Sequence, residues 1–358
     1  MHNMLSTPIF LVSWLLASCG KGSSGGGGNT GGNTPPKADT TFTNPLLSSG
    51  PDPWVIRKDG DSNYYYTNTL GNRLALWATT KMSQLGQASP VTIWTPPTTG
   101  SYSREIWAPE LHNFKGKWYM YFAADDGSND NHRIYVLEND DANPLSANWV
   151  FKGKVADTTA DRWAIDASAF EYNNQLYLVW SGWQGTVNTE QDIFIAQLSD
   201  PVTITGQRAM ISSPTQSWEK VGAPPAVNEG PEALISPSGR LFLTFSASGC
   251  WTDSYSLGLL TLRTGGDPMN PADWTKSTAP VFATQADNGA YAPGHNGFFT
   301  TKDGKQSWLL YHANSSAGQG CGNARNPRMQ PFTWRPDGTP DFGTPAKINT
   351  PMQKPSGE

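Results

Sequence analysis

Three carboxylates, Asp52, Asp166 and Glu229, each begin a short segment of the same kind, although more than 50 residues separate one from the next. Two carboxyl groups on either side of a bond can hydrolyse a glycoside, because a protonated one donates to the leaving oxygen and an ionised one activates water. A third carboxyl group nearby can raise the pKa of the acid by repulsion between like charges. The longer side chain of Glu229 favours it as the acid. An isolated Asp-Pro is ordinarily a turn, so this chemistry requires a fold that brings the three together.

The three segments belong to a pattern that occurs five times, at intervals of roughly 55 to 66 residues. A polar or aromatic head residue is followed by small or proline residues, an apolar anchor, a Gly/Asn turn and an aromatic-rich strand. The five head residues are Asp52, Trp107, Asp166, Glu229 and His295. Short strands repeated in this way indicate a propeller, whose blades bring equivalent positions together around a central channel. We therefore expect an all-β fold, a five-bladed β-propeller over residues 41–358, with the head residues at one end of its axis.

Composition fits many short strands and a neutral ligand. Only 15% of the residues are charged, aromatic residues make up 11%, and Gly and Pro number 36 and 28. No long stretch has a helical period, and the repeats leave no room for a second domain. The net charge of −5 is spread along the chain without a basic block, so nucleic acid is not expected as a partner. Sugars, with their flat apolar faces, fit an aromatic-rich and weakly charged protein. A monomer is expected.

The N-terminus predicts export. Residues 5–16 are mostly apolar, too few to span a bilayer but enough for the core of a signal peptide, which we place at residues 1–18. The sequence Leu-Ala-Ser-Cys at 16–19 resembles a bacterial lipobox, which predicts lipidation of Cys19 and a flexible Gly/Ser-rich linker over residues 19–40. The expected product is an exported bacterial lipoprotein, attached to a membrane in the periplasm or at the cell surface. The alternative is ordinary secretion with an incidental cysteine, because residues 1–4 carry no Lys or Arg.

The other two cysteines, Cys250 and Cys321, follow Gly-containing loops in the fourth and fifth repeats. Two cysteines in an exported domain commonly pair, and these two repeats are neighbours in a propeller. We predict a disulfide that joins loops near the mouth of the channel. Two free buried thiols are the alternative.

Taken in order, five segments resemble the signatures of glycoside hydrolase family 43: GPDPWV at 50–55, IWAPEL at 106–111, IDAS at 165–168, NEGP at 228–231 and PGHN at 293–296. The resemblance covers about residues 45 to 345. It implies a five-bladed propeller and an inverting mechanism, with Asp52 as the general base, Glu229 as the general acid and Asp166 as the residue that tunes and orients the acid. Glu110 and Glu232, the competing carboxylates, are interpreted as structural.

The same resemblance suggests roles for a histidine and an arginine, and position along the repeats suggests roles for four tryptophans. In the family the fifth-blade histidine, here His295, faces the channel and often lies beside a metal ion, commonly calcium, mostly through water. A structural calcium ion is therefore a hypothesis, a neutral hydrogen-bonded histidine is the alternative, and the chemistry needs no cofactor. Arg328 resembles the late arginine that reaches the sugar, with Arg325 as the alternative. Four tryptophans at heads or strand ends are candidates to line the sugar pocket: Trp54, Trp107, Trp183 and Trp251.

The segments SGWQ at 181–184 and SGCW at 248–251 are most similar to exo-acting α-L-arabinofuranosidases that trim 1,5-linked arabinan. The expected function is thus release of L-arabinofuranose from arabinan, a plant cell-wall polysaccharide. A β-xylosidase or an arabinofuranosidase acting on xylan side chains is an alternative, because the two sugars present similar hydroxyls. A carbohydrate-binding propeller without turnover would lack an acid or a base. A retaining fructan-type hydrolase would need Asn-Asp-Pro-Asn and Glu-Cys motifs, and neither occurs.

Overall fold

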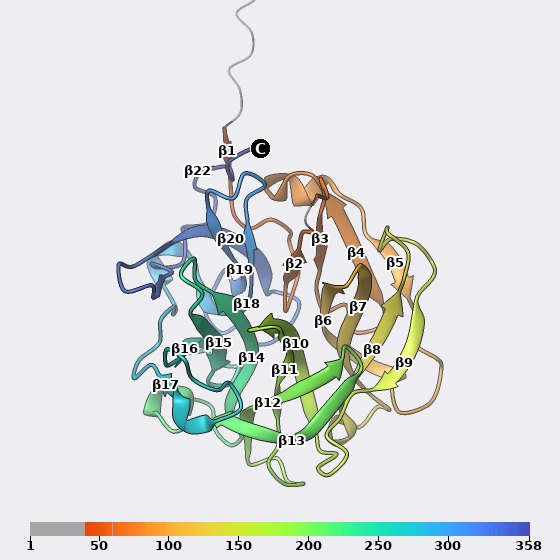
Figure 1. The fold of residues 1–358 in the computed structure, drawn as a ribbon. Coiled ribbons are helices and arrows are strands. Elements are labelled where there is room, and N and C mark those ends of the chain that lie inside the picture. Colours follow the sequence, from red (N-terminus) through yellow and green to blue (C-terminus); the bar gives the residue numbers. More distant parts are fainter. Residues whose placement is uncertain (1–39, 59) are drawn as a thin grey trace, which may run out of the picture. The chain divides into compact units, whose positions relative to one another are not determined.

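The computed structural model describes residues 40–358, except 59, so the predicted signal peptide, the lipidation site Cys19 and nearly all of the predicted linker lie outside the described residues. The described part is built from strands and short 3-10 turns (Figure 1). Those turns are η1 (Met82–Gln87), η2 (Asn129–Asn131), η3 (Ser217–Glu219), η4 (Pro271–Asp273) and η5 (Ala286–Asn288). Within residues 40–358, other than 59, none of these helices has the length and apolar character needed to cross a membrane.

Twenty of the strands form five blades of four antiparallel strands each. Blade 1 contains β2 (Trp54–Ile56), β3 (Tyr64–Thr67), β4 (Leu74–Thr79) and β5 (Val91–Trp94). Blade 2 contains β6 (Arg104–Phe114), β7 (Lys117–Asp125), β8 (Arg133–Asn139) and β9 (Val150–Lys154). Blade 3 contains β10 (Ala164–Tyr172), β11 (Gln175–Gly182), β12 (Glu190–Asp200) and β13 (Thr203–Ser212). Blade 4 contains β14 (Ala226–Ile235), β15 (Leu241–Ala247), β16 (Ser256–Leu262) and β17 (Trp274–Lys276), and blade 5 contains β18 (Tyr291–Thr300), β19 (Ser307–Asn314), β20 (Asn326–Trp334) and β21 (Pro340–Asp341).

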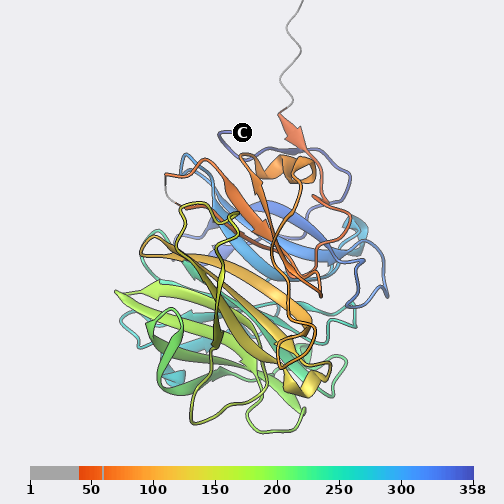
Figure 2. The same ribbon diagram turned by 90° about the vertical axis from the view of Figure 1, so that its right-hand side faces the viewer.

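The blades close into a ring around the five inner strands β2, β6, β10, β14 and β18, each of which contacts the next. Blades 3 and 4 are also linked by a short parallel pairing of β12 with β14. Beside blade 5, β1 (Thr41–Phe42) pairs with β22 (Met352–Gln353), so the first described residues and the C-terminus lie together (Figure 2). The predicted five-bladed β-propeller is confirmed.

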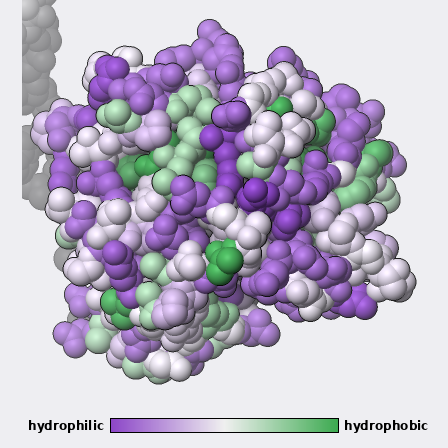
Figure 3. Space-filling view, turned by 90° about the horizontal axis from the view of Figure 1, so that it is seen from below, coloured by the Kyte–Doolittle hydropathy of each residue, from purple (hydrophilic) through white to green (hydrophobic). Residues whose placement is uncertain are grey.

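Aromatic residues hold the blades together. Each of the five interfaces between adjacent blades contains at least one buried hydrophobic cluster. Between blades 1 and 2, for example, Tyr65 packs edge-on against Trp118, with ring centroids 5.4 Å apart. Burying one such side chain contributes about 1.5–3 kcal/mol, so the buried aromatic residues stabilise the packing of one blade on the next. The face in Figure 3 is mostly hydrophilic, with only small and separate hydrophobic areas.

Tight turns fix the register of the hairpins. Lys115 and Gly116 join β6 to β7, and Asn173 and Asn174 join β10 to β11. All four residues have positive φ, which is the requirement of the two-residue turns that match the twist of antiparallel strands. The Gly/Asn turn that the repeated pattern predicts is therefore present in these two blades.

An irregularity of the backbone at or near the start of each inner strand positions the head residues. In every blade, the head residue or the residue directly after it has a positive φ: Asp52, Ala108, Asp166, Gly230 and His295. In four of these strands the pairing register also shifts at this point. Bulges re-aim side chains, and here they turn them toward the channel. The head residues are therefore not all at equivalent positions. Glu229 lies one residue before the position that Asp52, Asp166 and His295 share.

In the fourth repeat, the position with positive φ is occupied by a glycine, Gly230. Its φ is +54°, and a Cβ atom at this position would lie 3.2 Å from the ring of His295. A side chain would therefore be strained and crowded there. In this repeat the carboxylate side chain belongs to the preceding residue, Glu229, and the bulge itself is retained.

Candidate active site

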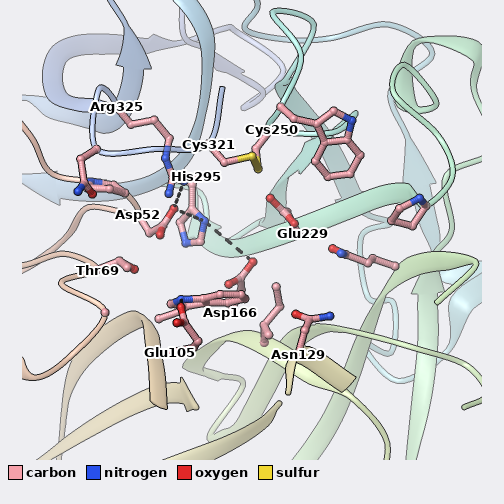
Figure 4. A pocket seen from close by; sticks show the side chains of 18 of the residues that line it. Asp52, Thr69, Glu105, Asn129, Asp166, Glu229, Cys250, His295, Cys321 and Arg325 are labelled. Carbon is pink, nitrogen blue, oxygen red and sulfur yellow. Dashed lines mark hydrogen bonds and ion pairs between the residues drawn. A yellow bond between two sulfur atoms is a disulfide. The ribbon is translucent and has the colours of Figure 1, made fainter. Parts of the chain in front are cut away.

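A cavity of about 630 Å³ opens where the inner strands begin. Asp52, Asp166, Glu229 and His295 line it, and they come from four different blades. Figure 4 shows Asp52 and Glu229 on opposite sides of the cavity, with Asp166 between them in this view. The structure thus brings together the three carboxylates that the repeats predicted to meet.

Cationic and imidazole groups surround Asp52. Arg325 donates from Nη1 to Asp52 Oδ1 at 2.7 Å, and His295 Nδ1 lies 3.3 Å from the same oxygen. His312 Nδ1 accepts the backbone N–H of Asp52 at 3.1 Å. Burial alone would raise the pKa of Asp52, but Arg325 and then the two histidines hold this pKa well below its usual value. Asp52 is therefore ionised at neutral pH.

Glu229 has the opposite environment. Burial raises its pKa to about 7, and the charge of Asp52 acts in the same direction. The hydroxyl of Tyr255 donates to Glu229 Oε1 at 2.9 Å and, together with Arg325, partly offsets this rise. A large fraction of Glu229 therefore carries a proton near neutral pH, which is the state that a general acid needs.

Asp166 lies within reach of both charges. The backbone N–H of Gly230 donates to Asp166 Oδ2 at 3.0 Å, and His295 Nδ1 is 4.0 Å from that oxygen. Burial, and then repulsion from Glu229 and Asp52, raises the pKa of Asp166 well above its usual value. Because Asp166 and Glu229 repel each other when both are ionised, the proton bound to one depends on the charge of the other.

Glu110 and Glu232 form a second layer of carboxyl groups deeper in the channel. Each follows the bulge residue of its strand by two positions, and neither lines the cavity. His112 Nε2 lies 2.9 Å from Glu110 Oε2, and Ser168 Oγ donates to Glu232 Oε2 at 3.1 Å. These contacts satisfy buried polar groups below the cavity and place both glutamates away from its mouth.

The four predicted pocket tryptophans separate into two groups. Trp107 and Trp251 line the cavity, and Trp251 is 46% exposed. Trp54 instead donates from Nε1 to the Leu111 carbonyl at 2.9 Å and lines a different cavity, at the end of the channel where the inner strands finish. Trp183 is only 2% exposed and stacks on Trp163, with centroids 4.9 Å apart. Trp163, which the prediction missed, lines the cavity instead.

The structure also corrects the choice of arginine. Arg328, the residue favoured from sequence, is fully buried inside blade 5. It donates to Asn326 Oδ1 and to the carbonyls of Gly289 and Asn314, so its guanidinium cannot reach the cavity. Arg325 precedes β20 in a loop and lines the cavity. Loops at the mouth reach the site, whereas Arg328 on β20 faces the interior of its blade.

The predicted disulfide between Cys250 and Cys321 is confirmed. Its Cα atoms are 5.1 Å apart, and both residues line the cavity (Figure 4). The bond joins the loop after β15 to the loop that leads to Arg325. It therefore restrains the segment from which Arg325 approaches Asp52.

Comparison with known proteins places this site in a family. The model of the family described as Glycosyl hydrolases family 43 matches residues 42–340. The chain belongs to glycosyl hydrolase family 43. An extracellular exo-α-(1→5)-L-arabinofuranosidase of Streptomyces avermitilis is 41% identical over 321 residues, covering 87% of this chain and 65% of the relative. The enzyme of that name from Streptomyces chartreusis is 38% identical, covering 76% of this chain and 82% of the relative.

A solved structure agrees with this assignment. The α-L-arabinofuranosidase from Lactobacillus brevis superposes with a TM-score of 0.81 at 35% identity, covering 86% of this chain and 98% of that one. The chain spans just under two thirds of the length of two curated relatives that it matches, the S. avermitilis enzyme and an α-L-arabinofuranosidase of Humicola insolens, at 65% and 63%. The family resemblance carried by the five segments is confirmed.

The surroundings of His295 bear on the calcium hypothesis for this family 43 protein. Calcium takes six to eight oxygen ligands, and the described residues contain no group of three or more His, Cys, Asp or Glu side chains placed to hold a metal ion. His295 directs Nδ1 toward Asp52, and its backbone N–H donates to Ser246 Oγ at 2.8 Å. The contacts of His295 are therefore with Asp52 and Ser246, and these residues do not supply a set of calcium ligands.

Sequence reasoning missed Tyr255 and His312. Tyr255 contacts Glu229 and His312 contacts Asp52, each from the side away from the cavity. Tyr255 ends the loop before β16, and His312 lies on β19. Neither belongs to a head segment, so the repeat pattern carries no signal for them.

Proposed function

We propose that this protein is an inverting exo-α-L-arabinofuranosidase that releases L-arabinofuranose from α-1,5-linked arabinan. The observation that carries the chemistry is the pair of opposite environments in one cavity, where Arg325 and two histidines lower the pKa of Asp52 and burial raises the pKa of Glu229 to about 7. The similarity to relatives named exo-α-(1→5)-L-arabinofuranosidases supports the choice of sugar and linkage.

In this proposal Asp52 is the general base and Glu229 the general acid. Glu229 protonates the glycosidic oxygen as the bond to the anomeric carbon breaks. Asp52 takes a proton from a water molecule that attacks that carbon from the opposite face, so the configuration inverts. Asp166 orients the acid, and whenever Asp166 itself is ionised its charge repels the ionised form of Glu229 and so raises the pKa of the acid. Two carboxyl groups and water complete the reaction, so no cofactor takes part, and a calcium ion near His295 remains a hypothesis on which no step depends.

The stereochemical test follows directly. Proton NMR of the first product from an α-L-arabinofuranoside should show the β-anomer before mutarotation. A retained anomer would contradict the role of Asp52, because retention requires a carboxylate that attacks carbon itself.

The sugar and linkage require a second test. We expect hydrolysis of 4-nitrophenyl α-L-arabinofuranoside to exceed that of 4-nitrophenyl β-D-xyloside, and debranched arabinan to be a better substrate than arabinoxylan. A preference for the xyloside would leave the acid and base in place but replace the proposed substrate.

Exo action is supported by the aromatic side chains and the bridged loops around the cavity. A pocket that accepts one chain end should release single arabinose units, and the viscosity of debranched arabinan should fall slowly relative to the release of reducing sugar. Early accumulation of mixed oligosaccharides would instead indicate an open groove and an endo mode of cleavage.

We also propose that the protein is exported and anchored through Cys19. Export is supported by the relatives named extracellular, and the anchor rests on the lipobox-like residues 16–19. Radiolabelled palmitate should be incorporated into the wild-type protein but not into Cys19→Ser, which should be recovered in the soluble exported fraction. Labelling of both proteins would exclude Cys19 as the lipidation site.

A further inference from the structure

Tyr255 contacts the acid without facing the substrate. It is 1% exposed and does not line the cavity, yet its hydroxyl donates to Glu229 Oε1 at 2.9 Å. Its backbone lies in the loop just before β16, outside every head segment. Tyr255 therefore approaches Glu229 from the side opposite to the space that a sugar would fill.

The ring of Tyr255 is fixed on two sides. It stacks on His312, with centroids 5.8 Å apart and planes 12° apart. On another side lies Gly294, where a Cβ atom would be 2.3 Å from the Tyr255 ring. His312 also accepts the backbone N–H of Asp52. Tyr255, which contacts Glu229, is thus packed directly against His312, which contacts Asp52.

This contact distinguishes the two oxygens of Glu229. An oxygen that accepts a hydrogen bond is less available to carry a proton, so the proton of the acid is favoured on Oε2. After proton transfer, the same hydrogen bond stabilises the carboxylate that forms, and hydrogen bonds to charged acceptors are stronger than neutral ones. The other groups that face Glu229 are charged or titratable and come from other blades: Asp166, Asp52, His295 and Arg325.

We propose that Tyr255 is a positioning residue for the general acid, which orients Glu229 and directs its transferable proton toward the leaving oxygen through Oε2. This inference rests on the proposed function, since it assumes that Glu229 is the acid. It assigns a role in the reaction to a side chain that does not touch the substrate.

The test is Tyr255→Phe, which keeps the ring and its stacking but removes the hydroxyl. We expect kcat on arabino-oligosaccharides to fall about 10-fold, a fraction of what general acids contribute. Hydrolysis of 4-nitrophenyl α-L-arabinofuranoside should change little, because that leaving group needs little protonation. The alkaline limb of the pH profile should move to higher pH, because the lost hydrogen bond had stabilised the ionised acid.

Tyr311→Phe is the matched control. Tyr311 is also fully buried, and its hydroxyl donates to Gln330 Oε1 at 3.1 Å inside blade 5, away from the cavity. It should leave the pH profile and the ratio of the two substrates unchanged. If Tyr255→Phe does the same, or lowers both substrates equally, Tyr255 has only a structural role and the inference is overturned.

A double-mutant cycle separates this inference from the proposed function. If Tyr255 acts through Glu229, Tyr255→Phe should have almost no further effect on the oligosaccharides in a Glu229→Gln background. An undiminished effect in that background would contradict the inference while leaving the acid assignment intact. Full activity of Glu229→Gln alone on oligosaccharides would instead overturn the acid assignment on which it rests.

Discussion

Asp52 and Glu229 lie in the same cavity, but the protein treats the two carboxyl groups in opposite ways. Asp52 is surrounded by Arg325, His295 and His312, which favour its ionised form. Glu229 is faced by other carboxyl groups and one tyrosine hydroxyl, and burial dominates its pKa. Because desolvation acts on both, the difference arises from neighbouring charges rather than from depth. Residue type alone therefore does not determine which group acts as the acid.

The largest expected effect comes from removing the base. Asp52→Asn should lower kcat/KM by about 10⁴-fold, at the upper end of what a positioned base contributes. The loss should be similar for debranched arabinan and for 4-nitrophenyl α-L-arabinofuranoside, because water must be activated whatever the leaving group. Steady-state kinetics on both substrates would measure it. A variant that retained activity on the nitrophenyl substrate alone would assign Asp52 to the leaving-group side.

Removing the acid should separate the two substrates. Glu229→Gln should lower kcat on arabinan about 10³-fold, yet affect the nitrophenyl glycoside far less, because nitrophenolate leaves without protonation. The alkaline limb of the pH profile, which reports the acid, should disappear for the substrate that remains. Equal losses on both substrates would mean that Glu229 has no role in protonation.

Replacing Arg325 should change the environment that distinguishes Asp52 from Glu229 without removing either carboxylate. Arg325→Gln removes the largest of the charges that lower the pKa of Asp52, so this pKa should rise and the acidic limb of the profile should move to higher pH. We expect a loss of about 10-fold to 100-fold in kcat/KM near pH 5, measured from the full pH profile.

Arg328→Gln is the matched control for this change. Arg328 has its hydrogen bonds inside blade 5, so its loss should lower the thermal midpoint by leaving buried acceptors unpaired. Its pH profile should keep the wild-type acidic limb. A shift of that limb in Arg328→Gln, and not in Arg325→Gln, would restore the choice made from sequence.

The sequence predicts the ring and its carboxylates because both depend on periodic features. Head residues recur with the blades, and the turns at 114–117 and 172–175 carry the Gly and Asn that positive φ favours. The sequence does not show the bulge that places Glu229 one residue before its counterparts. That offset depends on strand pairing, which no local pattern encodes.

Side-chain direction explains the remaining errors. Arg325 and Arg328 are three residues apart, and only the point where β20 begins decides which one faces the cavity. Trp163 and Trp183 stack on each other, so either could have lined the pocket until the two strand ends were placed. Tyr255 reaches Glu229 across a loop. Each of these depends on contacts between segments distant in sequence.

The smallest expected effect compares the two carboxylates through stability. The pKa of Glu229 is raised from 4.5 to about 7 in the folded state, so stability falls as the pH rises through this interval. Glu229→Gln should therefore be more stable than the wild type at pH 8, by on the order of 1 kcal/mol because the side chain is partly exposed to the cavity. At pH 4 this gain should vanish.

For Asp52 the sign is opposite, since its lowered pKa contributes stability above the unfolded value of 3.8, and Asp52→Asn should be less stable at pH 8. Thermal midpoints of both variants at the two pH values would measure this, and a change of the same sign in both would show that their environments do not differ as the contacts indicate.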